Sequence, residues 1–321
     1  MNEPAADWRP TASLEVLRCR AQMLRIAREW FTRSGALEVE TPTLSKAAVT
    51  DVHLASIEAQ VCGAKRYLHT SPEFAMKRLL AAGYGDLWQI ARVYRDDESG
   101  RMHNPEFTLI EWYRLGIDDH ALMREVEALI GAMLADRRTL PAAEYLSYRD
   151  AFRRHAGLDP FEDPLPRLVE AITAAGIVPP SGLDAERDAW LDLVMATLVG
   201  PELGRGAPTF VFDYPASQAA LARRRDRVAA RFELYLDGIE LANGFHELAD
   251  AAEQRQRIDA DLERRRARGL PTPPIDRHLL MALASGLPDC AGVALGFDRL
   301  VMCAVHARHI DEVIALPFAR A

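Results

Sequence analysis

The chain has 321 residues and a mass of 35.8 kDa; 49% of its residues are hydrophobic, 27% are charged, and its formal net charge is −8. This composition is typical of a folded globular protein with a substantial core, and it excludes a disordered chain. The acidic net charge argues against a protein whose main function is to bind the phosphate backbone of nucleic acids, although a local basic groove is still compatible with it.

The cysteines and the apolar segments indicate in which cellular compartment the protein is expected. The four cysteines are scattered, without a CxxC pair or a histidine at ligand spacing, so we expect reduced thiols in a cytoplasmic protein. No apolar run is long enough to cross a membrane, and the N-terminal segment lacks a basic region followed by an apolar one. We therefore expect neither membrane insertion nor export.

The first third of the chain predicts a long helix followed by short strands and a second helix. Ser13 can cap the first helix and Gly35 can end it. Ser71 is expected to cap the second helix, with Pro72 in its first turn and Gly83 after its last. The expected elements are a helix over 14–33, an extended segment over 37–44, a strand over 66–70, the helix after Ser71, and strands over 86–95 and 104–115.

The rest of the chain predicts helices first and then a return to strands. The helices are expected over 119–135, 147–156, 164–176 and 184–199, and the later elements are a strand over 208–215, a hairpin over 231–247, helices over 248–268 and 277–285, a strand over 292–297 and a helix over 298–307. Strands in hairpins with helices grouped around them indicate an antiparallel α+β domain, with a mainly helical insertion at about 145–207.

The hairpin around Asp237-Gly238 carries the first candidate site. This dipeptide favours a two-residue type I′ turn, which places Glu233 and Glu240 as diagonal neighbours on one face, roughly 7–8 Å apart. The register expected from this turn pairs Leu236 with Ile239, Tyr235 with Glu240 and Leu234 with Leu241. Two such carboxylates can bridge a divalent ion, and an amphipathic hairpin with a solvated acidic face is the alternative.

Two further places can hold an anion, although neither a GxxxxGK[ST] loop nor a GxGxxG loop after a strand is present. Alternation puts Phe107, Glu111 and Tyr113 on one face of the strand over 104–115, near Arg95 at the end of the preceding strand. Arg299 opens a helix directly after a strand, where an anion is favoured. Taken singly, each place also fits an ordinary strand pair or an ordinary helix start.

Together these segments resemble the signature motifs of class II aminoacyl-tRNA synthetases, and most closely the catalytic domain of the lysyl enzymes. The segments are GALEVETPTL, RVYRDDESGRMHNPEFTLIEWY and GVALGFDRL for motifs 1, 2 and 3, and ELYLDGIELANGFHEL for the lysine-specific segment before motif 3. The resemblance implies an antiparallel sheet flanked by helices, a homodimer with the motif 1 proline at its interface, and ATP and Mg²⁺ as reactants.

The nucleotide site follows from the same resemblance. It implies that Arg95 contacts the α-phosphate and the substrate carboxylate. Phe107 is expected to stack under the adenine, while Arg299 covers the adenine and reaches the γ-phosphate. His103 is expected at the phosphate tail, and Asp97 takes the place of the usual motif 2 glutamate at the adenine edge. Arg95 and Arg299 are thus the expected catalytic residues.

The metal and amino-acid sites are implied in the same way. Glu233 and Glu240 are expected to hold Mg²⁺, with Glu240 also facing ATP. The residues expected around the amino acid are Ser71, Glu73, Glu111, Tyr113, Asn243, Phe245, Glu247 and Ala294. A pocket with several buried carboxylates selects a cation, because an unpaired buried charge is costly. For Glu73 the alternative is a first-turn glutamate that serves the helix dipole.

Two departures from the lysyl enzymes narrow the expected function. The first helix begins near residue 14, so we expect no anticodon-binding domain, and tRNA is an improbable partner. Ser71 and Ala294 stand where those enzymes usually have alanine and glycine, which disfavours an α-amine in the usual place. Both departures resemble a paralogous family that activates (R)-β-lysine, or lysine, as an adenylate and transfers it to a lysine side chain of elongation factor P.

Three questions stay open at the level of sequence. A minimal lysyl-tRNA synthetase that charges tRNA is one alternative function, and a regulatory paralogue without catalysis is another. The arginine runs over 223–225 and 264–266 are candidates for contacting the acceptor, and solvated helix faces are the alternative for them. No general base for the transfer step is identifiable.

Overall fold

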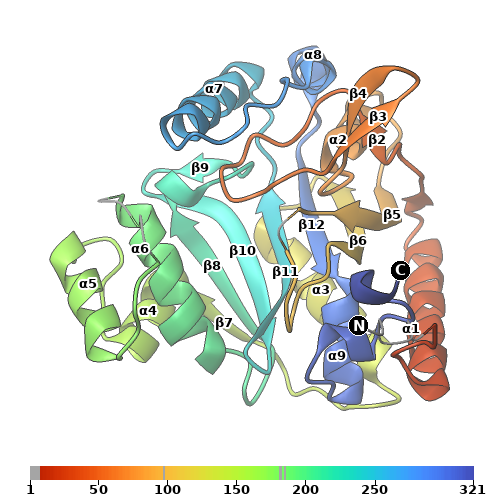
Figure 1. Cartoon of the computed structure of the whole chain (residues 1–321), viewed down its shortest axis with the longest axis horizontal. Coiled ribbons are helices and arrows are strands. Elements are labelled where there is room, and N and C mark those ends of the chain that lie inside the picture. The colour runs from red at the N-terminus through yellow and green to blue at the C-terminus, as the bar shows by residue number, and fades with distance from the viewer. Residues whose placement is uncertain (1–7, 97, 181–182, 184–185) are drawn as a thin grey trace, which may run out of the picture.

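A nine-stranded, mostly antiparallel sheet forms the centre of the protein (Figure 1), which we describe from a computed structural model for residues 8–96, 98–180, 183 and 186–321. The strand order is β1-β5-β6-β12-β11-β10-β8-β7, with β9 paired to β10. The bounds are β1 Leu37–Glu38, β5 Leu87–Tyr94, β6 Glu106–Leu115, β7 Glu144–Ser147, β8 Thr209–Pro215, β9 Arg224–Arg225, β10 Val228–Leu236, β11 Ile239–His246 and β12 Cys290–Gly296. β1 and β7 pair in parallel with their neighbours β5 and β8, so the sheet is antiparallel between its two edges.

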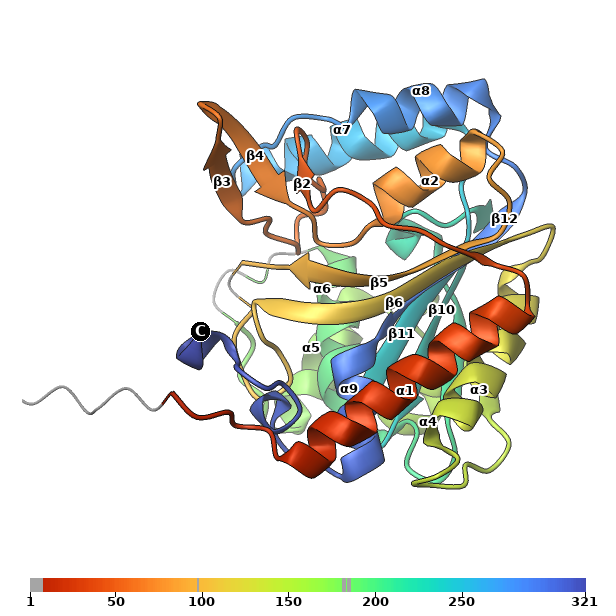
Figure 2. The ribbon, with the colours of Figure 1, turned by 90° about the vertical axis from the view of Figure 1, so that its right-hand side faces the viewer.

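Helices cover both faces of this sheet. α1 (Leu14–Arg33), α3 (Asp119–Leu134) and α9 (Phe297–Val305) lie on one side, and α2 (Glu73–Ala81), α7 (Ala251–Ala267) and α8 (Arg277–Gly286) lie on the other (Figure 2). A small sheet lies beside α2, with β2 (Leu44–Ser45), β4 (Ala64–Leu68) and β3 (Glu58–Val61) in that order. The core between the sheet and α1, α3 and α9 is apolar, whereas the opposite face carries the candidate site.

A third group of helices packs beyond the far edge of the sheet, beside β7 and β8. It consists of α4 (Tyr148–Ala156), α5 (Leu165–Ala174) and α6 (Arg187–Val194), which a π-helical turn over Met195–Val199 continues. These elements share their own apolar core with residues of β8 and β10. They lie within the segment expected as a helical insertion, although β7 joins the main sheet and was not anticipated.

The local predictions in the first half agree closely with the structure. α1 spans Leu14–Arg33, with the Ser13 side chain accepting a hydrogen bond from the Val16 amide as its cap. The expected strand pair is present as β5 and β6. The N-cap of α2 is Pro72 instead of Ser71, because Pro72 already has right-handed helical φ and ψ; the Ser71 hydroxyl still accepts from the Glu73 amide and donates to the Glu111 carboxylate.

The hairpin of β10 and β11 has the predicted turn and a different register beyond it. Asp237 and Gly238 both have positive φ, at 56° and 75°, and Tyr235 pairs with Glu240 as expected. Leu234, however, pairs with Ala242 and not with Leu241, because a bulge shifts the register between Leu234 and Tyr235. The predicted Leu234–Leu241 pair was therefore wrong.

No helix in the part of the chain that the structure describes is long and apolar enough to span a membrane.

Candidate active site

A large cavity opens on the face of the sheet below α2 and α7, with a volume of about 1200 Å³. Residues from distant parts of the sequence line it, including Ser71 and Glu73 at the start of α2, Arg95 after β5, Asn243 on β11 and Ala294 on β12. The structure thus places five of the eight residues expected around the amino acid, and one of the two expected catalytic arginines, around one space.

A buried acidic pocket adjoins this cavity, and Glu111 on β6 lies inside it. Its carboxylate is 1% exposed; the Ser71 hydroxyl lies 2.9 and 3.1 Å from its two oxygens, and the Tyr113 hydroxyl donates to it at 2.9 Å. Burial and the nearby charge of Glu73 raise the pKa of Glu111 to about 8. Without a bound cation, this carboxyl group therefore holds a proton at neutral pH.

Lys77 on α2 is a member of this pocket that we did not anticipate from the sequence. Its ammonium is 2% exposed and lies 2.6 Å from Glu73 Oε1 and 2.6 Å from Glu247 Oε2. The two carboxylates raise its pKa against the opposing effect of burial. The position of Lys77 four residues after Glu73 on a helix predicts an ion pair of this kind, but Glu247 is distant in sequence and joins only in the fold.

Glu247 closes the pocket just after β11. Burial raises its pKa to about 7, against the opposing charge of Lys77. Within the described chain its buried Oε1 has no hydrogen-bond donor. A Cβ built on Gly292 of β12 would lie 2.6 Å from this oxygen and 2.3 Å from the Tyr113 ring, so the absence of a side chain at Gly292 leaves the pocket its depth.

The other expected pocket residues lie near the acidic group. Ala294 pairs with Glu111 on one side and with Asn243 on the other across the sheet, and Phe245 lines the same cavity. The Oδ1 atom of Asn243 is buried and has no hydrogen-bond donor in the described chain. An ammonium entering the cavity therefore meets acceptors that the protein itself leaves unused.

Arg95 and Phe107, which are expected at the α-phosphate and under the adenine, lie side by side after the end of β5 and at the start of β6. The guanidinium carbon of Arg95 lies 5.0 Å from the centre of the Phe107 ring, and Glu98 lies 3.4 Å from the same guanidinium. A flat aromatic ring beside an arginine suits a purine base next to a phosphate. Asp97, which was expected at the adenine edge, lies outside the described residues.

Arg299 stands at the start of α9 and is held by three groups. It donates to the Glu240 carbonyl at 3.0 Å and to the Met102 carbonyl at 3.3 Å, and its Nη2 lies 2.6 Å from His103 Nε2. Burial and the positive charge of Arg299 lower the pKa of His103, so this ring is neutral and accepts the hydrogen bond. His103, Glu240 and Arg299 therefore form one cluster.

The two hairpin glutamates have very different surroundings. Glu233 is buried, and its carboxylate accepts from Tyr214 at 2.5 Å, Tyr235 at 2.6 Å and Arg231 at 2.5 Å. Glu240 keeps its carboxylate 42% exposed, and partial burial together with the charge of Glu233 raises its pKa to about 7. A metal ion thus finds a free oxygen on Glu240, whereas Glu233 would first have to release one of its donors.

Among the described residues, no group of three or more His, Cys, Asp and Glu side chains is arranged to hold a metal ion. Mg²⁺ at phosphates commonly takes only one or two carboxylates from the protein. The arrangement around Glu240 is compatible with that mode of binding. The joint binding of one ion by Glu233 and Glu240 stays a prediction.

The arginines of the two runs have different surroundings. Arg265 is buried and donates to the carbonyls of Pro271, Asp51 and Leu54, while Arg225 pairs with the fully buried Asp119. Arg224 and Arg264, by contrast, line the large cavity, and a contact of either residue with the acceptor stays a prediction.

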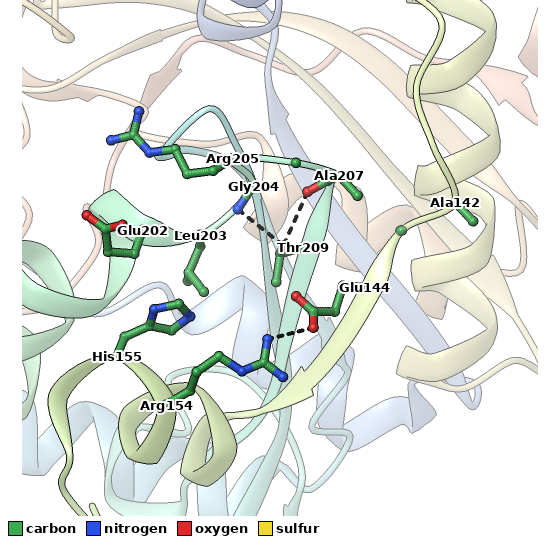
Figure 3. A pocket seen from close by; sticks show the side chains of 12 residues that line it. Ala142, Glu144, Arg154, His155, Glu202, Leu203, Gly204, Arg205, Ala207 and Thr209 are labelled. Carbon is green, nitrogen blue, oxygen red and sulfur yellow. Dashed lines mark hydrogen bonds and ion pairs between the residues drawn. The ribbon is translucent and has the colours of Figure 1, made fainter.

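A second, smaller cavity of about 340 Å³ lies at the edge of the sheet (Figure 3). Glu144 of β7 and Arg154 of α4 form an ion pair at 2.6 Å in its lining. None of the expected site residues lines it, so it is separate from the candidate active site.

Comparisons with known proteins extend over almost the whole chain. The family of class II tRNA synthetases (D, K and N) matches residues 1–320. The elongation factor P–(R)-β-lysine ligase of Vibrio cholerae is 47% identical over 98% of this chain and 99% of its own length. The proteins of the same name in Salmonella arizonae and Salmonella dublin are each 48% identical, with the same coverage.

Proposed function

The chain belongs to the class II tRNA synthetases (D, K and N), and on this premise we propose that it is an ATP-dependent ligase that activates (R)-β-lysine, or lysine, and transfers it to a lysine side chain of elongation factor P. The name of the relatives supports the acceptor and the amino acid. The observation that carries the proposal is the buried acidic pocket that adjoins the same cavity as Arg95.

The first step is the formation of an aminoacyl adenylate. A carboxylate oxygen of the amino acid attacks the α-phosphorus of ATP in line and forms a new oxygen–phosphorus bond. The bond from the α-phosphorus to the oxygen that bridges to the β-phosphate breaks, and pyrophosphate leaves. Arg95 lines the same cavity as Ser71 and Glu73 and lies beside the Phe107 ring, which supports a role for its guanidinium in holding the reacting carboxylate and the α-phosphate. Arg299, beside His103 and Glu240, is placed to stabilise the negative charge on the leaving phosphates.

The second step moves the aminoacyl group. The neutral amine of the acceptor lysine attacks the carbonyl carbon of the adenylate, AMP leaves, and the amine gives up one proton. None of the site residues that the structure describes is assigned as a general base for this proton, and we expect the acceptor to lose it to solvent. Enzyme residues contribute to this step by orientation, because they hold the adenylate in place.

Mg²⁺, when bound with ATP, would neutralise charge on the phosphates. We propose Glu240 as the protein ligand, since its carboxylate is partly exposed beside Arg299. Glu233 would add negative charge near this site, and its carboxylate is held by hydrogen bonds from Tyr214, Tyr235 and Arg231.

The test is the intact mass of elongation factor P after incubation with the protein, ATP, Mg²⁺ and either (R)-β-lysine or lysine. We expect a gain of one lysyl group, formed faster with the β-isomer. Arg299→Ala should slow the reaction by roughly 10²–10³-fold, which is the usual effect of removing a donor to transition-state charge. Arg255→Ala is the matched control, because Arg255 is an exposed partner of Asp259 on α7.

Other outcomes separate the alternatives. If pyrophosphate is released while the factor stays unmodified, activation is correct and the acceptor is not, which restores tRNA as the candidate. If neither isomer yields pyrophosphate, the ligase assignment fails in favour of a regulatory paralogue. The comparisons favour neither alternative, since the named relatives are ligases of elongation factor P.

We further propose that the chain acts as a single catalytic domain in a cytoplasmic homodimer. The exposed leucines Leu14 and Leu37 and the exposed Leu44 of the motif 1 segment support an interface there. The four free cysteines suit a reducing compartment.

A further inference from the structure

We infer that Lys77 is a specificity-determining residue: it balances one charge of the acidic pocket, so that the pocket is matched to an amino acid carrying two ammonium groups. This inference rests on the proposed function, because it concerns the same substrate site. It goes further in assigning a role to a buried lysine that neither step of the reaction requires.

The geometry makes Lys77 a fixed part of the pocket. Its ammonium lies 2.6 Å from one carboxylate on its own helix and 2.6 Å from another after β11. A lysine ammonium has three donors and can hold both carboxylates at once. Lys77 therefore positions Glu73 and Glu247 and turns one oxygen of Glu247 toward itself, while Oε1 of Glu247 stays without a donor in the described chain.

A charge count links this arrangement to the substrate. The carboxylates of Glu73, Glu111 and Glu247 with the ammonium of Lys77 leave two negative charges in a buried space. A lysine or β-lysine brings two ammonium groups and places its carboxylate on Arg95, so the filled pocket is neutral. An amino acid with one ammonium group would leave one carboxyl group without a cation, so that group either keeps its proton and gains no ion pair or stays as a costly unpaired buried charge.

The same count predicts a proton exchange on binding. In the empty pocket the pKa of Glu111 is raised to about 8 by burial and by Glu73, and that of Glu247 to about 7 by burial. The charged and titratable groups that surround these carboxyls are Lys77 and Glu73 on α2, Tyr113 on β6, Arg223 before β9 and Cys290 on β12, and the Ser71 hydroxyl donates a hydrogen bond to Glu111. The substrate ammonium groups lower both pKa values, so binding of lysine releases about one proton near neutral pH.

The first measurement needs no variant. Calorimetric titration of the whole protein with lysine, in buffers of different ionisation enthalpy, gives the number of protons released. Release of about one proton at pH ~7.5 supports the charge balance. Binding of lysine without any proton release would overturn it.

The second measurement uses charge-matched variants in ATP–pyrophosphate exchange. Lys77→Met should raise the KM for lysine by roughly 10- to 100-fold, because a pocket carboxylate then stays unpaired, and should change kcat much less. Adding Glu73→Gln to Lys77→Met returns the pocket to two negative charges. The KM for lysine of this double variant should be at least about tenfold lower than that of Lys77→Met. Lys77→Arg should keep the KM near that of the wild type.

The controls separate this inference from the proposed function. Lys65→Met removes an exposed lysine, paired with Glu58 in the small sheet, and should leave the exchange unchanged. If the wild type exchanges pyrophosphate with lysine but the double variant is no better than Lys77→Met, Lys77 is only structural and the inference fails alone. If the wild type exchanges with neither lysine nor (R)-β-lysine, the proposed function fails, and the inference fails with it.

Discussion

Gly292 shows how one missing side chain shapes the pocket. Its backbone is not in the left-handed region, so an alanine would be compatible with its conformation. A Cβ there would nevertheless lie 2.3 Å from the Tyr113 ring and 2.6 Å from Glu247 Oε1. Neither neighbour can retreat easily, since Tyr113 donates to Glu111 and Glu247 faces Lys77.

We predict that Gly292→Ala displaces Tyr113 and Glu247 and raises the KM for lysine by roughly tenfold or more. The KM for ATP should stay the same, and the overpacking should lower the free energy of unfolding by about 1–3 kcal/mol. Pyrophosphate exchange with each substrate varied in turn, and urea denaturation, measure the two effects.

Gly131→Ala provides the matched control for this change. Gly131 lies inside α3 with nothing within 4 Å of an added Cβ. Alanine there should raise the free energy of unfolding by about 0.5–1 kcal/mol and leave both KM values alone. Equal KM values for lysine in the two variants would contradict the role given to Gly292.

At the scale of elements, the placement of Arg299 depends on how α9 is anchored. Asp298, which precedes Arg299, is 2% exposed; it accepts from the Thr108 amide of β6 at 2.6 Å and pairs with Arg20 of α1. Arg20 also lies over the Phe297 ring at 4.7 Å. One carboxylate thus ties a helix start to a strand and to a second helix, directly beside a proposed catalytic arginine.

We predict that Asp298→Asn costs roughly 3 kcal/mol of stability, because it breaks a buried ion pair and leaves Arg20 without its charge partner. A displaced Arg299 should also lower kcat for adenylate formation. Thermal denaturation and pyrophosphate exchange test the two parts. Glu29→Gln is the control, since Glu29 and Arg25 form an exposed pair on α1 that should contribute less than about 1 kcal/mol.

At the scale of the whole molecule, the site is a concentration of carboxyl groups whose pKa values lie above their ordinary range. The pKa is raised to about 8 for Glu111 and to about 7 for Glu247, which are both 1% exposed, with burial as the first cause in each. Between the ordinary pKa of a glutamate and these raised values, the folded state holds more protons than the unfolded state. The free energy of unfolding therefore falls as the pH rises through this range.

We predict that the Tm of the free protein falls between about pH 7 and about pH 8.5, by several degrees at about 2 °C per kcal/mol. Bound lysine should raise Tm more at the higher pH, because its ammonium groups replace the lost protons. The histidines whose pKa is lowered, such as His103, are already neutral in both states over this window. Scanning calorimetry with and without lysine measures both, and a Tm that rises with pH would contradict the prediction.

The sequence by itself determined the local structure and the family. Ser13 caps α1, Asp237 and Gly238 form the expected turn, and the strands β5 and β6 lie where alternation placed them. These features depend on residues close together in the chain, whose backbone preferences act before any tertiary contact forms. The motif segments are equally local, so the class II resemblance was readable without a structure.

Only the tertiary structure decided which charges meet. The spacing of Glu73 and Lys77 on one helix is typical of an ion pair. The contact of Lys77 with Glu247, however, forms only because the fold brings α2 and the end of β11 together. Likewise, the sequence predicts Glu233 as a metal ligand, whereas in the structure Tyr214 and Arg231 donate hydrogen bonds to its carboxylate. A buried charge is governed by every group that surrounds it and by its distance from water, and both depend on how segments remote in sequence pack together.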